Sequence, residues 1–311
     1  MYIILFMKNN VNLNHAKITK NDEFYTSYSD IEKEMSNYKK YFIGKTIYCN
    51  CDNPYVSNFT KYFINNFNSL KLKRLICTSY DKNTNNNLLL DIKNVNNIYI
   101  YQLEHNGDFR NQQCIDYIKQ ADIIITNPPF SLFRDFINIL LQYKKDFIIL
   151  GNLNAVSYKN VWEGIMSNNI HIGYNNDSKV FSTNNNQYAK LGNTIWFTSF
   201  ITYHPQIQLE AKYNKSYSKY VNFNAIEVNR IKDIPCDYIG LMGVPVSFML
   251  KYNPSQFEII GSSSKLANPI PKIGSNRFYI ELPDGSLKRC QERIVIRHIF
   301  ANQKRTILYQ V

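Results

Sequence analysis

Short apolar runs alternate with longer amphipathic segments along the first two thirds of the chain. The short runs are rich in Ile, Val, Tyr and Phe, which is typical of β-strands, whereas the longer segments space their apolar residues three or four apart, as helices do. The predicted strands are 46–49, 72–78, 97–102, 122–126, 146–150 and 194–202. The predicted helices between them are 56–68, 111–119, 132–143 and 159–167.

This order of strand, helix, strand is typical of an α/β fold, a parallel sheet with helices on both faces. In such sheets ligands bind beyond the carboxyl ends of the strands, so the residues just after each strand are the first candidates for a site. Before the first of these strands, a further helix over 31–41 is expected to begin at Ser29 or Asp30. Two Asn-rich stretches, 83–87 and 184–186, are expected to be loops.

Composition adds a basic charge and excludes a membrane protein. The 311 residues are 44% hydrophobic with a formal net charge of +12, which favours a polyanionic partner, although a merely solvated basic surface remains an alternative. Residues 206–311 hold 15 Lys and Arg and 8 Asp and Glu, so that third alone carries +7. No apolar run approaches the roughly 18 residues of a membrane span, and we expect a soluble, cytoplasmic protein.

The six cysteines are scattered along the chain without paired C-x-x-C spacing. Their pattern suggests neither a zinc site nor a disulfide framework, and we expect no bound metal.

Asn127, Pro128, Pro129 and Phe130 follow the fourth predicted strand and are the most informative feature of the chain. The two prolines fix φ and stiffen the loop. The Asn127 side-chain oxygen and the Pro128 carbonyl are two acceptors that can bind both hydrogens of an aromatic amino group, while Phe130 stacks on the ring. The alternative is a plain strand-to-helix turn in which Ser131 caps the helix.

Other short motifs accompany this loop, and the combination resembles the EcoRI-type adenine-specific DNA methyltransferase family. The motifs span almost the whole chain and are more specific together than the tetrapeptide alone. They lie at 22–26 (DEFYT), 48–54 (YCNCDNP), 57–59 (SNF), 106–110 (NGDFR), 192–198 (GNTIWFT), 242–245 (MGVP) and 251–258 (KYNPSQFE).

The resemblance implies a Rossmann-like, S-adenosylmethionine-dependent methyltransferase sheet with helices on both faces, and a smaller C-terminal target-recognition region. It implies that the catalytic domain is 1–205 and that the basic region 206–311 recognises the target. Residues 127–130 would be catalytic. The cofactor-binding residues it implies are Asp22, Phe24, Tyr25, Thr26, Cys51, Asp52, Pro54, Asp108 and Phe109.

The chemistry of the cofactor agrees with these positions. S-adenosylmethionine carries an ammonium, a sulfonium, a ribose diol and an adenine amino group, which call for carboxylates and aromatic faces rather than a glycine-rich phosphate loop. Asp52 and Asp108 offer carboxylates, although each could instead cap the next helix. Asp81 is a weaker candidate for the ribose diol.

Four basic residues near the C-terminus are candidates for binding DNA: Lys288, Arg289, Arg293 and Arg297. Charged and apolar residues alternate from Arg293 to Arg297, which predicts an edge strand with one face buried and the other turned toward phosphates. A solvated strand face is the alternative.

The expected substrate is an adenine flipped out of double-stranded DNA, since the amino group cannot reach a buried sulfonium from within the duplex. Trp196 is a second aromatic candidate near the site, although core packing is the simpler role. A cognate restriction endonuclease acting separately is a possible partner. The alternatives are methylation of RNA adenine or of a protein glutamine, or an inactive DNA-binding relative.

Overall fold

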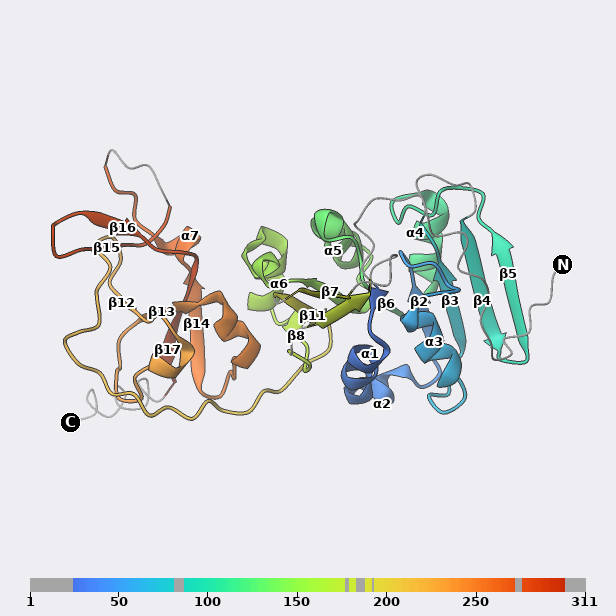
Figure 1. The fold of residues 1–311 in the computed structure, drawn as a ribbon, viewed down its shortest axis with the longest axis horizontal. Helices are drawn as coiled ribbons and strands as arrows, with labels where there is room; N and C mark the ends of the chain where they lie inside the picture. Colours follow the sequence, from blue (N-terminus) through green and yellow to red (C-terminus); the bar gives the residue numbers. More distant parts are fainter. Residues whose placement is uncertain are drawn as a thin grey trace. The chain divides into compact units, whose positions relative to one another are not determined.

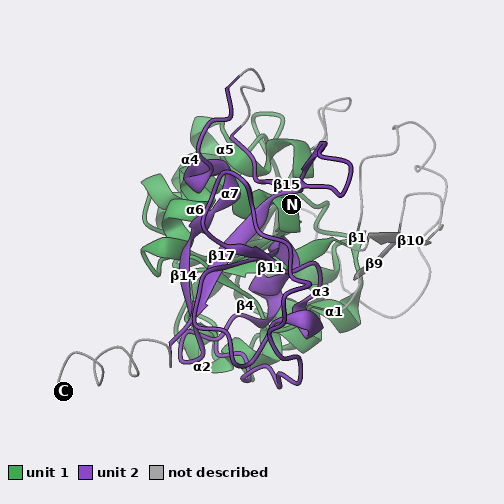
Figure 2. Ribbon diagram, turned by 90° about the vertical axis from the view of Figure 1, so that its left-hand side faces the viewer, with its two compact units in different colours: residues 1–202 green, residues 203–311 purple. Residues whose placement is uncertain are grey.

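The computed structural model describes residues 25–80, 87–176, 179–182, 188–191, 193–271 and 276–299, with side chains described for all of these except 179–182 and 188–191. The chain divides into two compact units, residues 1–202 and 203–311 (Figure 2). Among the described residues, no helix is long and apolar enough to cross a membrane.

An eight-stranded sheet forms the centre of the first unit, in the order β5-β4-β3-β2-β6-β7-β11-β8 (Figure 1). Its four middle strands, β3, β2, β6 and β7, run parallel. The outer pairings are antiparallel: β3 with β4 and β4 with β5 on one side, and β7 with β11 and β11 with β8 on the other. The strands are β2 (Thr46–Cys49), β3 (Arg74–Thr78), β4 (Leu88–Asn94), β5 (Asn97–Gln102), β6 (Ile123–Thr126), β7 (Asp146–Asn152), β8 (His171–Ile172) and β11 (Thr194–Thr198).

Helices cover both faces of this sheet, as predicted. Helices α1 (Tyr28–Met35), α2 (Lys39–Phe42) and α3 (Asn58–Asn65) lie on one face, and α4 (Gln112–Gln120), α5 (Phe133–Gln142) and α6 (Lys159–Met166) on the other (Figure 1). Side chains from α1 to α3 pack against alternate residues of β2, β3, β6 and β7 in one buried cluster. The two central strands, β2 and β6, are buried throughout, because a parallel sheet with helices on both faces has no solvated side.

Three details of this unit differ from the sequence-based prediction. Strand β4 was not predicted. It lies between β3 and β5, and β5 is antiparallel to β4 because only two residues separate these two strands. Strand β11 is antiparallel to β7 and ends at Thr198. Helix α1 begins earlier than expected, capped by the Ser27 hydroxyl, which accepts a hydrogen bond from the Asp30 amide at 3.1 Å.

A small sheet of β1 (Tyr25–Thr26), β9 (Lys179–Ser182) and β10 (Tyr188–Leu191) joins the start of the described chain to a later hairpin. Tyr25 pairs with Ser182 and Thr26 with Phe181.

The second unit is built on a four-stranded sheet in the order β12-β13-β17-β14, with a separate hairpin β15-β16. Its strands are β12 (Ile226–Glu227), β13 (Met242–Pro245), β14 (Phe257–Ser262), β15 (Tyr279–Glu281), β16 (Leu287–Arg289) and β17 (Arg293–His298). The short helix α7 (Ser263–Leu266) and the 3-10 helices η4 (Ile231–Asp233) and η5 (Val246–Lys251) complete it.

The prediction of an edge strand over 293–297 is wrong. Strand β17 lies between β13 and β14 and pairs antiparallel with both. Five of its six residues are buried, including Arg293 and His298. Both arginines of β17 are paired with carboxylates, Arg293 with Glu227 in the interior and Arg297 with Glu258 at a partly exposed position.

Candidate active site

The carboxyl ends of β2 and β6 meet at the point where the strand order changes direction. Strand β3 lies on one side of β2 and β6 on the other. In open α/β sheets ligands bind in the crevice beyond strand ends at such a point. Thr126 is the last residue of β6, and its hydroxyl donates a hydrogen bond to the carbonyl of Asn50, just after β2. This bond ties the loop at 50–57 to the loop at 127–130, so the two sequence motifs lie side by side.

The loop after β2 contains a residue in the left-handed conformation that glycine usually adopts. Cys51 adopts φ of 83°, in the left-handed region that non-glycine residues enter at a cost of about 1–3 kcal/mol. The turn directs the chain toward Asp52, whose carboxylate accepts a hydrogen bond from the Ser57 hydroxyl at 3.1 Å. Ser57 is the N-cap residue of α3, and Pro54, between Asp52 and Ser57, is buried.

The Cys51 thiol does not have the properties of a nucleophile. Burial raises its pKa well above the usual range, and the carboxylates of Asp52 and Asp108 raise it further, whereas a hydrogen bond with Thr126 lowers it. The thiol is therefore protonated at neutral pH, and a protonated thiol attacks poorly.

The loop after β6 is held rigidly from behind. Asn127 and Pro128 are buried, while Pro129 and Phe130 are half-buried. Phe130 begins the 3-10 turn η2 (Phe130–Leu132), in which the Leu132 amide donates to the Pro129 carbonyl at 2.9 Å. Phe130 makes no ring contact with another aromatic residue of the described chain, so its exposed face can accept a planar ligand.

The rigid support is Phe133, the first residue of α5. Its ring packs on Phe197 of β11 at 5.2 Å and lies so close to Gly151 of β7 that a Cβ there would approach it to 2.4 Å. The alternative in which Ser131 caps the helix is wrong: Leu132 is the N-cap residue, and it makes no side-chain capping bond.

The 106–110 loop joins the same end of the sheet. Gly107 has φ of 71° and lies against the Ser79 carbonyl beyond β3, where a Cβ would come within 1.8 Å of the oxygen. Asp108 follows and accepts hydrogen bonds from the Arg110 guanidinium at 2.6 and 2.9 Å. The hydrogen bond from Arg110 lowers the pKa of Asp108, so this carboxylate is charged at neutral pH. Phe109 is buried against Phe136 of α5, with ring centroids 5.0 Å apart.

Strand β1 brings Tyr25 and Thr26 to the start of α3. The Asn58 side-chain amide donates to the Thr26 carbonyl at 2.8 Å, one residue beyond Ser57. The structure therefore brings β1 beside the Asp52 loop. Three other predicted residues, Asp22, Phe24 and Asp81, lie outside the described residues.

Two buried polar side chains in this region bond to no residue that the structure describes. Asn50 is 1% exposed, and both its amide nitrogen and its oxygen lack a partner there; the Thr26 hydroxyl is in the same position. Buried polar groups are almost always hydrogen-bonded, so these atoms suit a polar ligand. The sequence analysis did not propose Asn50, although its place directly after a buried apolar strand was a usable signal.

Trp196 belongs to the core and not to the site surface. It is fully buried and packs edge-on against Phe59 at 6.1 Å. In the part of the chain that is described, no group of three or more His, Cys, Asp or Glu side chains is placed to hold a metal ion.

The four basic residues proposed for DNA have different surroundings. Lys288 and Arg289 are exposed on β16. Arg297 forms an ion pair with Glu258 at 2.5 Å and is partly exposed. The Arg293 side chain is only 10% exposed and donates to Glu227 at 2.5 and 2.9 Å. Arg293 thus pairs with a buried carboxylate. The prediction that it contacts phosphate is replaced by a structural role in the second unit.

Comparison with known proteins identifies what the chain resembles. A family model described as "Adenine-specific methyltransferase EcoRI" matches residues 12–300. The Type II methyltransferase M.EcoRI of Escherichia coli is 39% identical over 287 residues, which cover 80% of this chain and 88% of that protein. The Type II methyltransferase M.MgeORF184P of Mycoplasma genitalium is 38% identical over 317 residues, covering 91% and 98%. M.MpnI of Mycoplasma pneumoniae is 33% identical over 315 residues, covering 91% and 97%.

Proposed function

This chain belongs to the EcoRI family of adenine-specific methyltransferases and is a DNA methyltransferase, and from that membership we propose that it moves a methyl group from S-adenosylmethionine to the exocyclic amino nitrogen of adenine in double-stranded DNA. The observation that carries the proposal is the hydrogen bond between Thr126 and Asn50, which joins the Asn-Pro-Pro-Phe loop to the Asp52 loop at the crevice. Acceptors for an amino group and a carboxylate for a cationic cofactor then line one site.

The residues around the crevice fit S-adenosylmethionine. Asp52 would bind its ammonium group, and the buried amide of Asn50 and hydroxyl of Thr26 would supply further hydrogen bonds. Asp108 is charged but already bonded to Arg110, so we assign it a shared role, orienting the 106–110 loop while accepting one bond from the cofactor. The cofactor supplies an electrophilic methyl on a sulfonium.

The chain's own residues position the nucleophile. We assign the Asn127 side-chain oxygen and the Pro128 carbonyl as acceptors for the two amino hydrogens of adenine, which concentrates the nitrogen lone pair toward the methyl. The Pro129 carbonyl already accepts the Leu132 amide, so we assign the second acceptor to Pro128. Phe130 stacks on the base after the base leaves the duplex. Because the Cys51 thiol is protonated, no covalent thiolate attack on the base is needed or supported.

Action on DNA agrees with the cytoplasmic location expected from the sequence. We also propose that methylation protects the recognised sequence against a separate cognate endonuclease.

Purified protein incubated with S-adenosylmethionine labelled in its methyl group tests the acceptor. We expect label in double-stranded DNA, recovered as N6-methyladenine after digestion to nucleosides. Label found in RNA or in protein glutamine, with none in DNA, would replace this function with one of its two rivals.

Substituting Asp52 tests the cofactor site. Asp52→Ala should weaken S-adenosylmethionine binding at least tenfold, about 1.4 kcal/mol, because it removes the carboxylate assigned to the ammonium. Calorimetric titration measures this affinity directly. Asp116→Ala, which changes an exposed carboxylate on α4, is the matched control. Equal affinities for the two variants would remove Asp52 from the site.

Substituting Phe130 tests the base pocket. Phe130→Ala should weaken binding of a duplex whose target adenine is already unpaired by about 1–3 kcal/mol, because it removes base stacking. Phe130→Tyr keeps a stacking ring and should retain most of the affinity. Fluorescence anisotropy of labelled duplexes gives the comparison, and a Phe130→Ala variant that binds as tightly as the parent would place the base elsewhere.

A further inference from the structure

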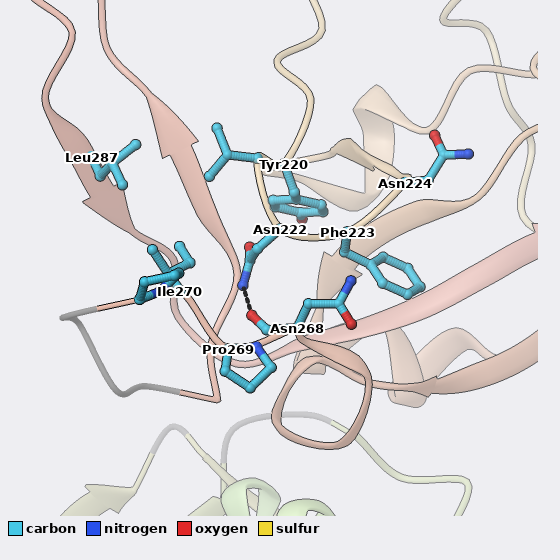
Figure 3. Close-up of a pocket in the computed structure, with 10 residues that line it drawn as sticks. Tyr220, Asn222, Phe223, Asn224, Asn268, Pro269, Ile270 and Leu287 are labelled. Atoms are coloured by element: carbon cyan, nitrogen blue, oxygen red, sulfur yellow. Dashed lines mark hydrogen bonds between the residues drawn. The ribbon is translucent and has the colours of Figure 1, made fainter.

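A cavity lies wholly within the second unit, and none of its described lining residues belongs to the candidate active site. It has a volume of about 640 Å³, within the range of small-molecule sites. Two segments, 220–224 and 268–271, form most of its wall, and Leu287 of β16 completes it (Figure 3).

None of the described residues that line this cavity carries a charged side chain. Its walls combine aromatic and apolar residues with three carboxamides, those of Asn222, Asn224 and Asn268. Asn222 is fully used by the fold: its side chain donates to the Asn268 and Arg277 carbonyls, both at 2.8 Å, and accepts from the Tyr279 amide. The first of these bonds is drawn in Figure 3.

Asn224 and Asn268 differ from Asn222. Both residues are exposed, and their carboxamides form no hydrogen bond with any residue in the described ranges. A carboxamide presents one donor and one acceptor side by side, the complement of an adenine edge at N6 and N7.

The aromatic wall is rigid. The Phe223 ring stacks on Phe278 at 4.9 Å with an interplanar angle of 16°, and Tyr220 packs on the same ring at 4.3 Å. Tyr220 donates its hydroxyl hydrogen to Glu227, which Arg293 binds from the other side. The buried pair thus fixes the cavity floor before any ligand arrives, which reduces the entropy lost on binding.

Exposed cations stand next to lining residues in the sequence, and we refer to these cations as the rim. Lys288 and Arg289 directly follow Leu287 and are exposed, and Lys219 precedes Tyr220. Burial lowers the pKa of Arg277, and the nearby like charge of Arg289 lowers it further. Arg277 has a carboxylate partner in Glu292, whereas Arg289 forms no ion pair with a described residue. An uncharged pocket beside exposed cations fits a base whose neighbouring phosphates lie on the rim.

We propose that this cavity recognises an adenine of the DNA target sequence other than the methylated one, with Asn224 and Asn268 contacting its edge and Lys288 and Arg289 the adjacent phosphates. The inference rests on the proposed function, since it takes DNA as the substrate. It makes these two asparagines determinants of sequence specificity rather than of methyl transfer.

The test compares Asn224→Ala and Asn268→Ala with Asn97→Ala, an exposed asparagine on β5 in the other unit. The recognised sequence is first found from the methylated sites or, if none is methylated, by selecting bound duplexes from a random pool. Each protein is then measured on that duplex and on duplexes changed at one base pair, for both equilibrium binding and kcat/KM. Thermal unfolding should be unchanged, because neither side chain bonds to the fold.

We expect the cavity variants to lose at least tenfold in discrimination at one non-target adenine, with cofactor affinity and discrimination elsewhere unchanged. Replacing that adenine by 7-deazaadenine, which lacks the N7 acceptor, should weaken binding by the parent but not by the variants. Discrimination equal to that of the parent at every position overturns the inference. Binding is measured separately from methylation. A parent that binds its sequence without methylating it would therefore contradict the proposed function, while its binding data would still test the proposed recognition by the cavity.

The rim is tested by salt dependence. Lys288→Ala combined with Arg289→Ala should reduce the slope of log affinity against log salt by about two, since two fewer counterions are released. Lys232→Ala, an exposed cation on η4, is the control and should leave the slope unchanged. A parental slope in the double variant would mean that the phosphates lie elsewhere and would overturn this part of the proposal.

Discussion

Asn127→Ala should lower the single-turnover rate of methyl transfer by a hundredfold or more. The adenine amino nitrogen is barely basic, and the loop holds no carboxylate or imidazole, so the rate depends on acceptors that orient the amino group beside the methyl donor. Removing one well-placed hydrogen-bonding group from such a site typically costs a factor of about 100 to 1,000, which at the lower limit is about 2.7 kcal/mol. Rapid-quench measurement with saturating enzyme and cofactor isolates this step.

The control for this variant is Ser131→Ala, directly after the loop in η2, exposed and outside the proposed contacts. Its rate should match that of the parent. Affinities for DNA and S-adenosylmethionine should change little in Asn127→Ala, because the lost interaction belongs to the reacting geometry. A parental rate in Asn127→Ala would mean that the catalytic loop lies outside 127–130.

Arg293→Ala should lower the free energy of unfolding by about 3–5 kcal/mol, since it leaves Glu227 as a buried charge without its cation. The exposed fractions of the two side chains, 10% and 3%, decide the size of the effect. Denaturant titration followed by circular dichroism measures it.

Arg297→Ala provides the comparison on the same strand. Arg297 and Glu258 are 25% and 43% exposed, so solvent screens this pair and its loss should cost only about 0–1 kcal/mol. If the two arginine variants are equally stable, Arg293 does not support the second unit, and its assignment to a structural role is wrong.

The spacing of apolar residues predicted those helices and strands whose buried positions form a regular pattern along the chain. Strands β2 and β6 and helices α3 to α6 were predicted within a few residues, because continuous apolar runs and helical spacing record a parallel sheet covered on both faces. The loop at 127–130 followed its strand as predicted for the same reason.

The wrong predictions concern residues and strands whose interaction partners are distant in the sequence. Arg293 and Arg297 looked like a phosphate-facing stripe, but their counter-charges are Glu227 and Glu258, 66 and 39 residues away. Nothing in residues 293–297 reveals those carboxylates. The central position of β17 likewise depends on β13 and β14, which the local pattern did not identify.

Backbone conformation was the other missing element at the site. Residues 50–54 contain no glycine, yet Cys51 itself adopts the left-handed conformation. The bond from Thr126 to Asn50 and the buried amide of Asn50 follow from that turn, and neither could be derived from residue types alone.

Single-molecule sequencing of DNA from cells that express the chain tests the central claim most directly. The parent should place N6-methyladenine at one short sequence throughout the genome, and Asn127→Ala, expressed to the same level, should leave those adenines unmodified or nearly so. Genomes without modified adenine, or with methyl groups on cytosine instead, would contradict the account.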